Sequence, residues 1–223
     1  MYGTGVGIEM QATALTVAIV RVKPAGATTV ATKVIERYHE RPATEWGNEY
    51  ALFLKEHGVK HVSAVAVLPK PEVTVRVIQL PGVDDKSLDA AVRYQVDGLH
   101  PYPDEDVAFS YARLNRTGAV VVAVARHETV DKHASLFAEA GVALQGFTAW
   151  PAAVHDARRI GLAAFTPAVL ALRDAGDGIE VYGESDARPV FAAVFPETPF
   201  ERARQLARAE LRLGPDTPVE PLP

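Results

Sequence analysis

VTVRVIQLP, residues 73–81, is rich in β-branched side chains and ends in proline, which predicts a strand that stops at that point. The residues after it alternate between helical and extended patterns, so the whole stretch predicts a compact βαββα unit. Because the segments on both sides have a different pattern, we expect this unit to be an insertion at residues 71–141. Its later elements are predicted as a helix within residues 84–99, strands at 107–114 and 119–125, and a helix at 128–140.

The segments that flank the insertion predict two related α/β units. Three strands, a helix and an almost wholly apolar strand precede it, and a strand and a helix follow it. Three further strands and a helix then repeat the βββα order, and the last nine residues contain four prolines. We therefore expect a first subdomain formed by residues 1–70 and 142–162, a partial second subdomain at residues 163–214, and an extended proline-rich tail at residues 215–223.

Composition excludes several classes of protein. The chain has 223 residues, a formal net charge of -5 and a sequence pI near 5.8, so it lacks the concentrated basic character of a nucleic-acid-binding protein. It contains no cysteine, which excludes disulfides, thiol catalysis and cysteine metal sites. Its seven histidines show no spacing typical of a closed metal-ligand set. No leader or membrane-spanning pattern is present, so we expect a cytoplasmic protein.

The motifs within and beside the predicted insertion resemble those of a known family. They are AVAVLP (64–69) before the insertion, LDAAVRYQ (88–95) and PYP (101–103) within it, and AVAR (123–126) near its end. Their order is similar to that of type IV pilus assembly proteins of the PilM family and of the cytoplasmic domain of type II secretion proteins of the GspL family. This resemblance implies an α/β fold of actin-like subdomains, ribonuclease H-like in their βββαβα order, with an inserted βαββα subdomain as in FtsA and a truncated second half.

Two predicted hairpins occupy the places where actin-like enzymes hold nucleotide phosphates. The first has Glu9-Met10-Gln11 where Asp-x-Gly is expected, and the second has Asp174-Ala175-Gly176 followed by Asp177-Gly178. An extra carboxylate there would repel a triphosphate, and a plain β-turn explains Asp and Gly equally. We therefore expect a protein that is not an enzyme and needs no cofactor, neither ATP nor Mg²⁺. The candidates for a degenerate phosphate loop are Asp174, Gly176 and Gly178.

The resemblance further implies partners and a surface that binds them. Proteins of this family bind a cytoplasmic segment of a single-pass inner-membrane protein, which would be PilN-like or GspM-like here, and act beside the assembly ATPase. The matching positions make Arg93, Tyr94, Leu99, Pro101 and Tyr102 the interface candidates, although aromatic residues and prolines at a helix end are also typical of a core. The implied role is a non-catalytic scaffold at the inner membrane, tethered there if the natural chain continues into a membrane helix.

Several alternatives stay open. The chain could be the N-terminal part of an actin-like ATP-binding protein or kinase, an interpretation that Asp174-Ala175-Gly176 favours and Glu9-Met10-Gln11 opposes. The pattern does not distinguish a pilus system from a secretion system, and it allows a homodimer. It predicts no nucleic-acid partner.

Overall fold

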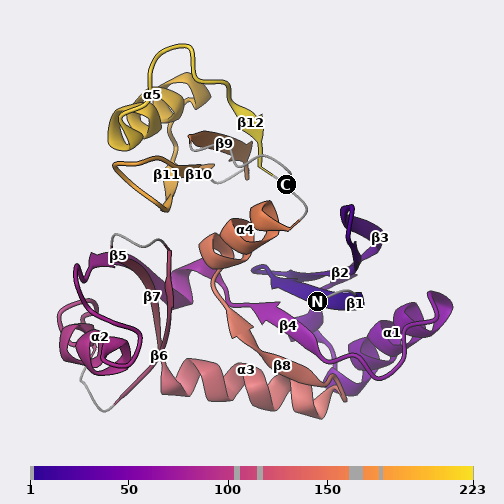
Figure 1. The fold of residues 1–223 in the computed structure, drawn as a ribbon. Coiled ribbons are helices and arrows are strands. Elements are labelled where there is room, and N and C mark those ends of the chain that lie inside the picture. The colour runs from indigo at the N-terminus through magenta and orange to yellow at the C-terminus, as the bar shows by residue number, and fades with distance from the viewer. Residues whose placement is uncertain (1–2, 103–105, 115–117, 161–167, 176–177, 223) are drawn as a thin grey trace. The chain divides into compact units, whose positions relative to one another are not determined.

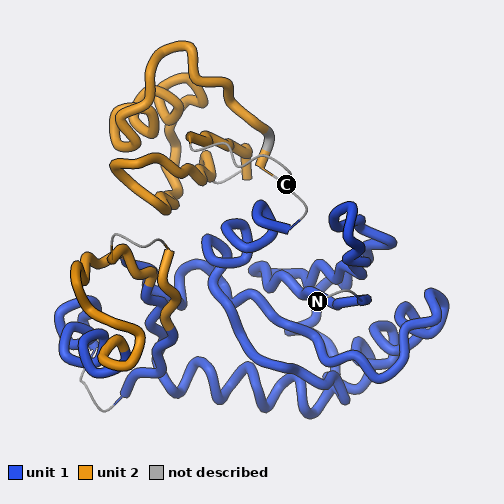
Figure 2. Tube along the Cα trace, in the orientation of Figure 1, with its two compact units in different colours: residues 1–76, 89–110, 122–162 blue, residues 77–88, 111–121, 163–223 orange. Residues whose placement is uncertain are grey.

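In the computed structural model, the described residues are 3–102, 106–114, 118–160, 168–175 and 178–222. The backbone contacts divide the chain into two compact units, which Figure 2 shows in different colours. Unit 1 consists of residues 1–76, 89–110 and 122–162, and unit 2 consists of residues 77–88, 111–121 and 163–223. Within the described ranges, no helix combines the length and the apolar composition that crossing a bilayer requires.

A five-stranded sheet forms the body of unit 1, with strand order β3-β2-β1-β4-β8 (Figure 1). The first three strands are antiparallel neighbours, whereas β4 is parallel to both β1 and β8. Apolar side chains alternate along β1 and β2, which places Val6, Ile8, Leu15 and Val17 together in one core. The strands are β1 (Gly3–Met10), β2 (Ala14–Lys23), β3 (Gly26–Glu36), β4 (Ala64–Val67) and β8 (Leu144–Thr148).

Two helices complete this core. The indole ring of Trp46 on α1 packs edge-on against the ring of Phe137 on α3, with ring centroids 5.6 Å apart. The sequence predicts Val130, Ala134 and Phe137 as the inward face of α3, but Ala134 is exposed and His133 is buried in its place. The reason is the helical period, because positions 130, 133 and 137 share one face. The elements are η1 (Tyr38–Glu40), α1 (Ala43–Glu56), α3 (His127–Glu139) and α4 (Trp150–Arg159).

The predicted insertion contains a separate three-stranded sheet of order β5-β7-β6, which is not continuous with the five-stranded sheet. Its last predicted helix, α3, contributes Phe137 to the core of the five-stranded sheet, and Ala140 and Val142 lie in that core too. The division into subdomains at residues 71–141 stays a prediction. The elements are η2 (Lys70–Glu72), β5 (Val73–Gln79), α2 (Leu88–Val96), β6 (Val107–Arg113) and β7 (Ala119–Arg126).

A four-stranded sheet in unit 2 has the order β11-β10-β9-β12 and packs against α5. Two antiparallel pairings are followed by one parallel pairing, as in β3-β2-β1-β4, so the structure confirms the repeated βββα order. Gly183 permits close packing of α5, since a Cβ there would lie 2.3 Å from Leu211 Cδ1. The elements are β9 (Val169–Asp174), β10 (Gly178–Glu184), β11 (Phe191–Pro196), α5 (Phe200–Leu211) and β12 (Glu220–Pro221).

The tail at residues 215–223, which the sequence predicts to be extended, contains a short strand near its end. Glu220 and Pro221 pair in parallel with β9, and the amide of Leu222 donates a hydrogen bond to Leu172 O at 3.2 Å. The Leu222 side chain is buried. Prolines are tolerated in β12 because it lies at the edge of its sheet, where one side of the strand needs no hydrogen-bond donors.

Candidate functional site

Helix α2 presents the interface candidates through its amphipathic pattern. The sequence predicts an apolar stripe along this helix, formed by Leu88, Ala91, Val92, Val96 and Leu99. Leu88, Val92 and Val96 recur every four residues and are buried, whereas Ala91 and Leu99 are half-buried. Arg93 and Tyr94 consequently lie on the exposed side of the helix. Tyr94 is 88% exposed, well above every other exposed large hydrophobic side chain in the described ranges.

Arg93 is fixed beside the exposed tyrosine. Its Nε lies 2.7 Å from Asp89 Oδ2, one helical turn earlier, and its guanidinium lies 5.1 Å from the ring centroid of Phe109 on β6. A side chain that is held in place loses little rotamer freedom when a partner binds. Arg93 and Tyr94 therefore combine a positioned cation with an aromatic ring that solvent surrounds, which are residue types enriched in binding hot spots.

The turn after α2 forms a second cluster. The ring of Tyr102 stacks on that of His100 at a centroid distance of 5.6 Å, and the Tyr102 amide donates a hydrogen bond to His100 Nδ1 at 3.1 Å. The guanidinium of Arg126, at the end of β7, lies 5.1 Å from the Tyr102 ring centroid, and Arg126 Nε is 3.6 Å from Asp106 Oδ2. The Tyr102 side chain is thus half-buried and contacts both the imidazole ring of His100 and the guanidinium of Arg126.

The remaining candidates of this turn differ in exposure. Leu99 is half-buried and its amide donates to Val96 O at 2.8 Å, whereas Pro101 is exposed. Pro103, the last residue of the PYP motif, lies outside the described residues. Among the described residues, no ring contact joins Tyr94 to Tyr102. The exposed side of α2 and the turn after it are therefore two separate groups of side chains, and their joint role as an interface stays a prediction.

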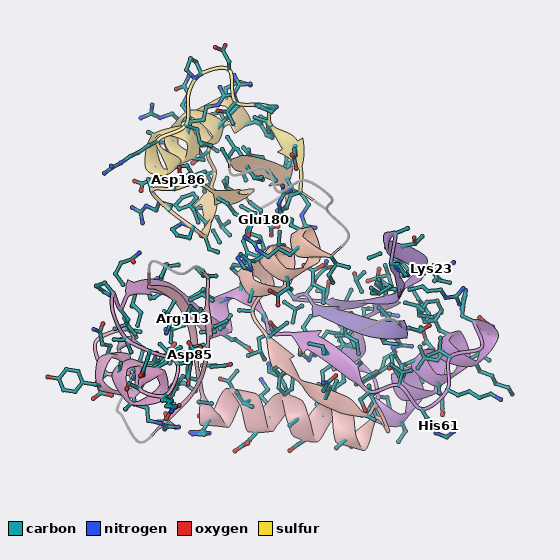
Figure 3. The ribbon with its side chains drawn as sticks, viewed as in Figure 1. Lys23, His61, Asp85, Arg113, Glu180 and Asp186 are labelled. Atoms are coloured by element: carbon teal, nitrogen blue, oxygen red, sulfur yellow. The ribbon has the colours of Figure 1, made fainter. Side chains whose placement is uncertain are left out.

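The loop that leads into α2 is held by side chains of its own unit. The amide of Ser87 donates to Asp84 Oδ1 at 2.8 Å, and the hydrogen bonds from Ser87 lower the pKa of the Asp84 carboxyl. Arg113 donates from Nε to Asp85 Oδ1 at 3.1 Å and from Nη2 to Val83 O at 2.8 Å, and Figure 3 labels Arg113 and Asp85. These contacts fix the loop just before the first helical turn.

The first hairpin, between β1 and β2, has its polar groups engaged. Met10 is 4% exposed and belongs to the core, and the amide of Gln11 donates to Ala14 O at 2.9 Å. The Gln11 side chain lies 3.4 Å from the Glu9 carboxylate, and the Gln11 carbonyl accepts a hydrogen bond from the Tyr38 hydroxyl at 3.4 Å. This geometry suits a tight hairpin, in which a buried methionine occupies the place of the middle residue of Asp-x-Gly.

The second hairpin, between β9 and β10, contains the predicted phosphate-loop residues. Asp174 ends β9 and is exposed, and the amide of Ala175 donates to Gly178 O at 3.0 Å. Gly178 lies in β10, where a Cβ would be 2.8 Å from Phe195 O on β11, so the pairing of these strands is sufficient reason for glycine there. Gly176 lies outside the described residues, and the assignment of this turn as a degenerate phosphate loop that needs no ATP or Mg²⁺ stays a prediction.

Sequence reasoning missed two members of the turn cluster, His100 and Arg126. Arg126 lies 24 positions after Tyr102 in the sequence, and only the return of β7 to the helix end brings the two together. A basic residue at the end of an apolar strand is the signal that the sequence offered. Among the described residues, no group of three His, Cys, Asp or Glu side chains could hold a metal ion.

Comparisons with known proteins give the fold of the chain. No protein-family model and no curated protein matches it. Among solved structures, it is similar to a chain of the PilM-PilN type IV pilus biogenesis complex, with 22% identity over 94% of this chain and 66% of that chain and a TM-score of 0.68. It is also similar to the cytoplasmic domain of EpsL, an inner membrane component of the type II secretion system of Vibrio cholerae, with 13% identity, 99% and 84% coverage and a TM-score of 0.62.

These two likenesses confirm the actin-like α/β fold that the sequence predicts. The chain spans just under two thirds of the length of the pilus protein that it matches.

Proposed function

We propose that this chain is a non-catalytic scaffold of the inner-membrane assembly platform of a type IV pilus or type II secretion system. It would act in the cytoplasm, peripheral to the inner membrane. Its partners would be a cytoplasmic segment of a PilN-like or GspM-like membrane protein and the assembly ATPase. The fold shared with a chain of the PilM-PilN complex and with the cytoplasmic domain of EpsL supports this role.

The observation that carries the proposal is the exposed ring of Tyr94, which follows Arg93 in the chain, while the Arg93 guanidinium contacts Asp89 and the ring of Phe109. An aromatic ring with this exposure contributes nothing to a core, while its burial by a partner would remove a large apolar surface from water. The turn from Leu99 to Tyr102, with Tyr102 held by His100 and Arg126, would border the same surface. A partner segment would be anchored on Tyr94 and oriented by the cation of Arg93.

Calorimetry with a cytoplasmic peptide of a PilN-like or GspM-like membrane protein from the same organism tests the proposal. Replacing Tyr94 with alanine should weaken peptide binding about tenfold or more, because hot-spot aromatics typically contribute about 2 kcal/mol or more on truncation. The matched control is Leu52→Ala, since Leu52 on α1 is 55% exposed and lies outside the proposed interface. If neither the wild type nor any variant binds, or if Tyr94→Ala binds as well as Leu52→Ala, the proposed interface is wrong.

The competing function is nucleotide binding at the turn between β9 and β10, which follows Asp174. The buried Met10 in the first hairpin and the strand pairing at Gly178 both favour a scaffold over an ATPase. Titration with Mg-ATP separates the two, and the scaffold predicts no binding at micromolar concentrations. Micromolar binding that Asp174→Asn abolishes would replace the scaffold with an actin-like ATP-binding protein.

A further inference from the structure

The edge strand β3 is the longest strand of unit 1, and in the described part of the chain it pairs only with β2. Its other side therefore presents the backbone donors and acceptors of alternate residues along this eleven-residue strand. Val30 and Val34 are 40% and 51% exposed on this strand, and they are two of the few large hydrophobic side chains that the chain exposes. This edge is independent of the interface on α2.

The pairing register sorts the side chains of the β2–β3 hairpin onto two faces. Ile19 lies opposite Ala31, and Val20 lies opposite Thr29, so Val30 is the extra residue of a bulge. Beyond the bulge, Arg21 lies opposite Thr28 and Lys23 lies opposite Gly26. Because side chains alternate along a strand, Arg21 and Lys23 share the face of Ile19, and Lys33, opposite Val17, shares it too.

The face with these cations carries no acid. Within the described residues, neither Arg21, Lys23 nor Lys33 forms an ion pair, and the hairpin from residue 14 to residue 35 contains no Asp or Glu. Lys23 lies at the tip of the hairpin, where Figure 3 labels it. The three cations are spread over roughly 20 Å along the strand at about 3.3 Å per residue. In a chain of net charge -5, this is a local positive surface.

The opposite face of the same hairpin carries valine side chains among threonine and alanine, and Glu36 lies at its far end. Val20 and Val22 lie opposite Thr29 and Ala27, and Val34 lies opposite Thr16. On the cationic face, the β3 neighbours of Arg21 and Lys23 are only Thr28 and Gly26, so the long side chains can reach across β3 toward its free edge. A strand added at this edge would meet positive charge on one face and valine side chains on the other.

We propose that the free edge of β3 binds an extended segment of a protein partner in which acidic and apolar side chains alternate. Backbone hydrogen bonds would supply the pairing, and the two faces would select the side chains. A bulge and a lysine on an edge strand both hinder pairing with an arbitrary strand. An acidic segment is favoured over an arbitrary one because its carboxylates would pair with the charge of Lys33. The proposal stands on this hairpin alone and does not depend on the proposed function.

Two other occupants fit less well. A second copy of the chain paired through β3 would offer Arg21, Lys23 and Lys33 no acidic partner, because residues 14–35 contain no Asp or Glu. An anionic bilayer would contact one face of the hairpin, yet the cations and the valines lie on opposite faces, so a bilayer could not use both.

Nuclear magnetic resonance of the isotope-labelled full chain tests the proposal. The probe is a short peptide of alternating Glu and Val, and the control peptide alternates Lys and Val. We expect saturable shifts of the backbone amides of residues 26–36 with the acidic peptide only. Raising the salt from about 50 to about 300 mM should weaken its binding severalfold, because the charges are solvent-exposed.

Charge reversal provides the matched comparison. Arg21→Glu/Lys23→Glu should weaken binding of the acidic peptide about tenfold or more, whereas Lys55→Glu/Lys60→Glu, at exposed positions that do not belong to this hairpin, should not. The proposal is overturned if β3 amides do not respond to millimolar peptide, or if the basic peptide binds equally. It is also overturned if the β3 amides shift on concentrating the protein alone, which indicates self-pairing, or if phosphatidylglycerol vesicles bind this hairpin while the peptide does not.

Discussion

Glu72 and His133 are 61 positions apart in the sequence, and Glu72 Oε2 lies 2.5 Å from His133 Nε2. Glu72 ends η2, just before the first strand of the predicted insertion, and His133 is 1% exposed on α3, which follows its last strand. One hydrogen bond therefore joins the beginning of the predicted insertion to its last helix. His133 Nδ1 is buried and has no partner among the described residues.

Removing the Glu72 carboxylate should destabilise the fold. Glu72→Ala leaves both ring nitrogens of His133 buried without a partner, and we expect a loss of about 1–3 kcal/mol in the free energy of unfolding. Glu72→Gln retains an acceptor oxygen and should lose less. Urea unfolding followed by tryptophan fluorescence measures the difference, with the exposed Glu56→Ala as control. A Glu72→Ala variant as stable as the control would contradict a structural role of the pair.

Gly47→Ala should destabilise the packing of α1. A Cβ at this position would lie 2.0 Å from Ala140 O and 2.8 Å from Ala140 C, so the two segments must separate. The clash outweighs the better helix propensity of alanine, which is worth up to about 1 kcal/mol, and we expect a net loss of about 2 kcal/mol. Gly7→Ala on β1 is the matched control, because a Cβ there would meet nothing within 4 Å. Equal urea midpoints for the two variants would show that α1 has room to move.

Tyr50→Phe should leave the protein as stable as the wild type or more so. The Tyr50 hydroxyl is buried and has no hydrogen-bond partner among the described residues. Removing an unpaired buried hydroxyl avoids a desolvation cost of about 1–3 kcal/mol, while the ring and its packing remain. Thermal and urea unfolding measure the change. A loss above about 1 kcal/mol would mean that this hydroxyl is satisfied in solution.

Alkaline pH should weaken the fold through two tyrosines. Burial raises the pKa of both Tyr38 and Tyr50 from 10.0 to about 12, and the Glu72 carboxylate adds to the effect at Tyr38. Between these values the unfolded chain has lost protons that the folded chain still binds, so stability is complete below pH 10 and falls toward pH 12. The loss is on the order of 2 kcal/mol for each tyrosine.

The matched comparison uses the Tyr38→Phe/Tyr50→Phe variant. Its urea midpoint should fall less steeply than that of the wild type between pH 10 and pH 12, since the other titrating groups are shared. Identical slopes for the two proteins would rule out the buried tyrosines as the source of the alkaline loss.

The sequence predicts the elements of this fold well because they rest on local patterns. The stripe of Leu88, Val92 and Val96 follows from the helical period and is buried as expected. The pairing of Glu72 with His133, and of Tyr102 with Arg126, depends on how distant segments meet, and no local pattern encodes it. The exposure of Tyr94 was only partly predictable from the sequence. The helical period places the side chain opposite the apolar stripe, but an aromatic residue near a helix end is equally typical of a core.

Composition predicts the conformation at the end of the chain but not its packing. Four prolines in nine residues favoured an extended tail, and the structure adds that β12 pairs with β9 and that Leu222 is 7% exposed. Leu222→Ala should therefore destabilise unit 2 by about 2 kcal/mol or more, as truncation of a buried leucine does. Hydrogen exchange of the β9 amides, compared with those of β1, locates the loss in the four-stranded sheet. The exposed Pro215→Ala is the control, and equal exchange in the two variants would show that β12 adds nothing to the stability of its sheet.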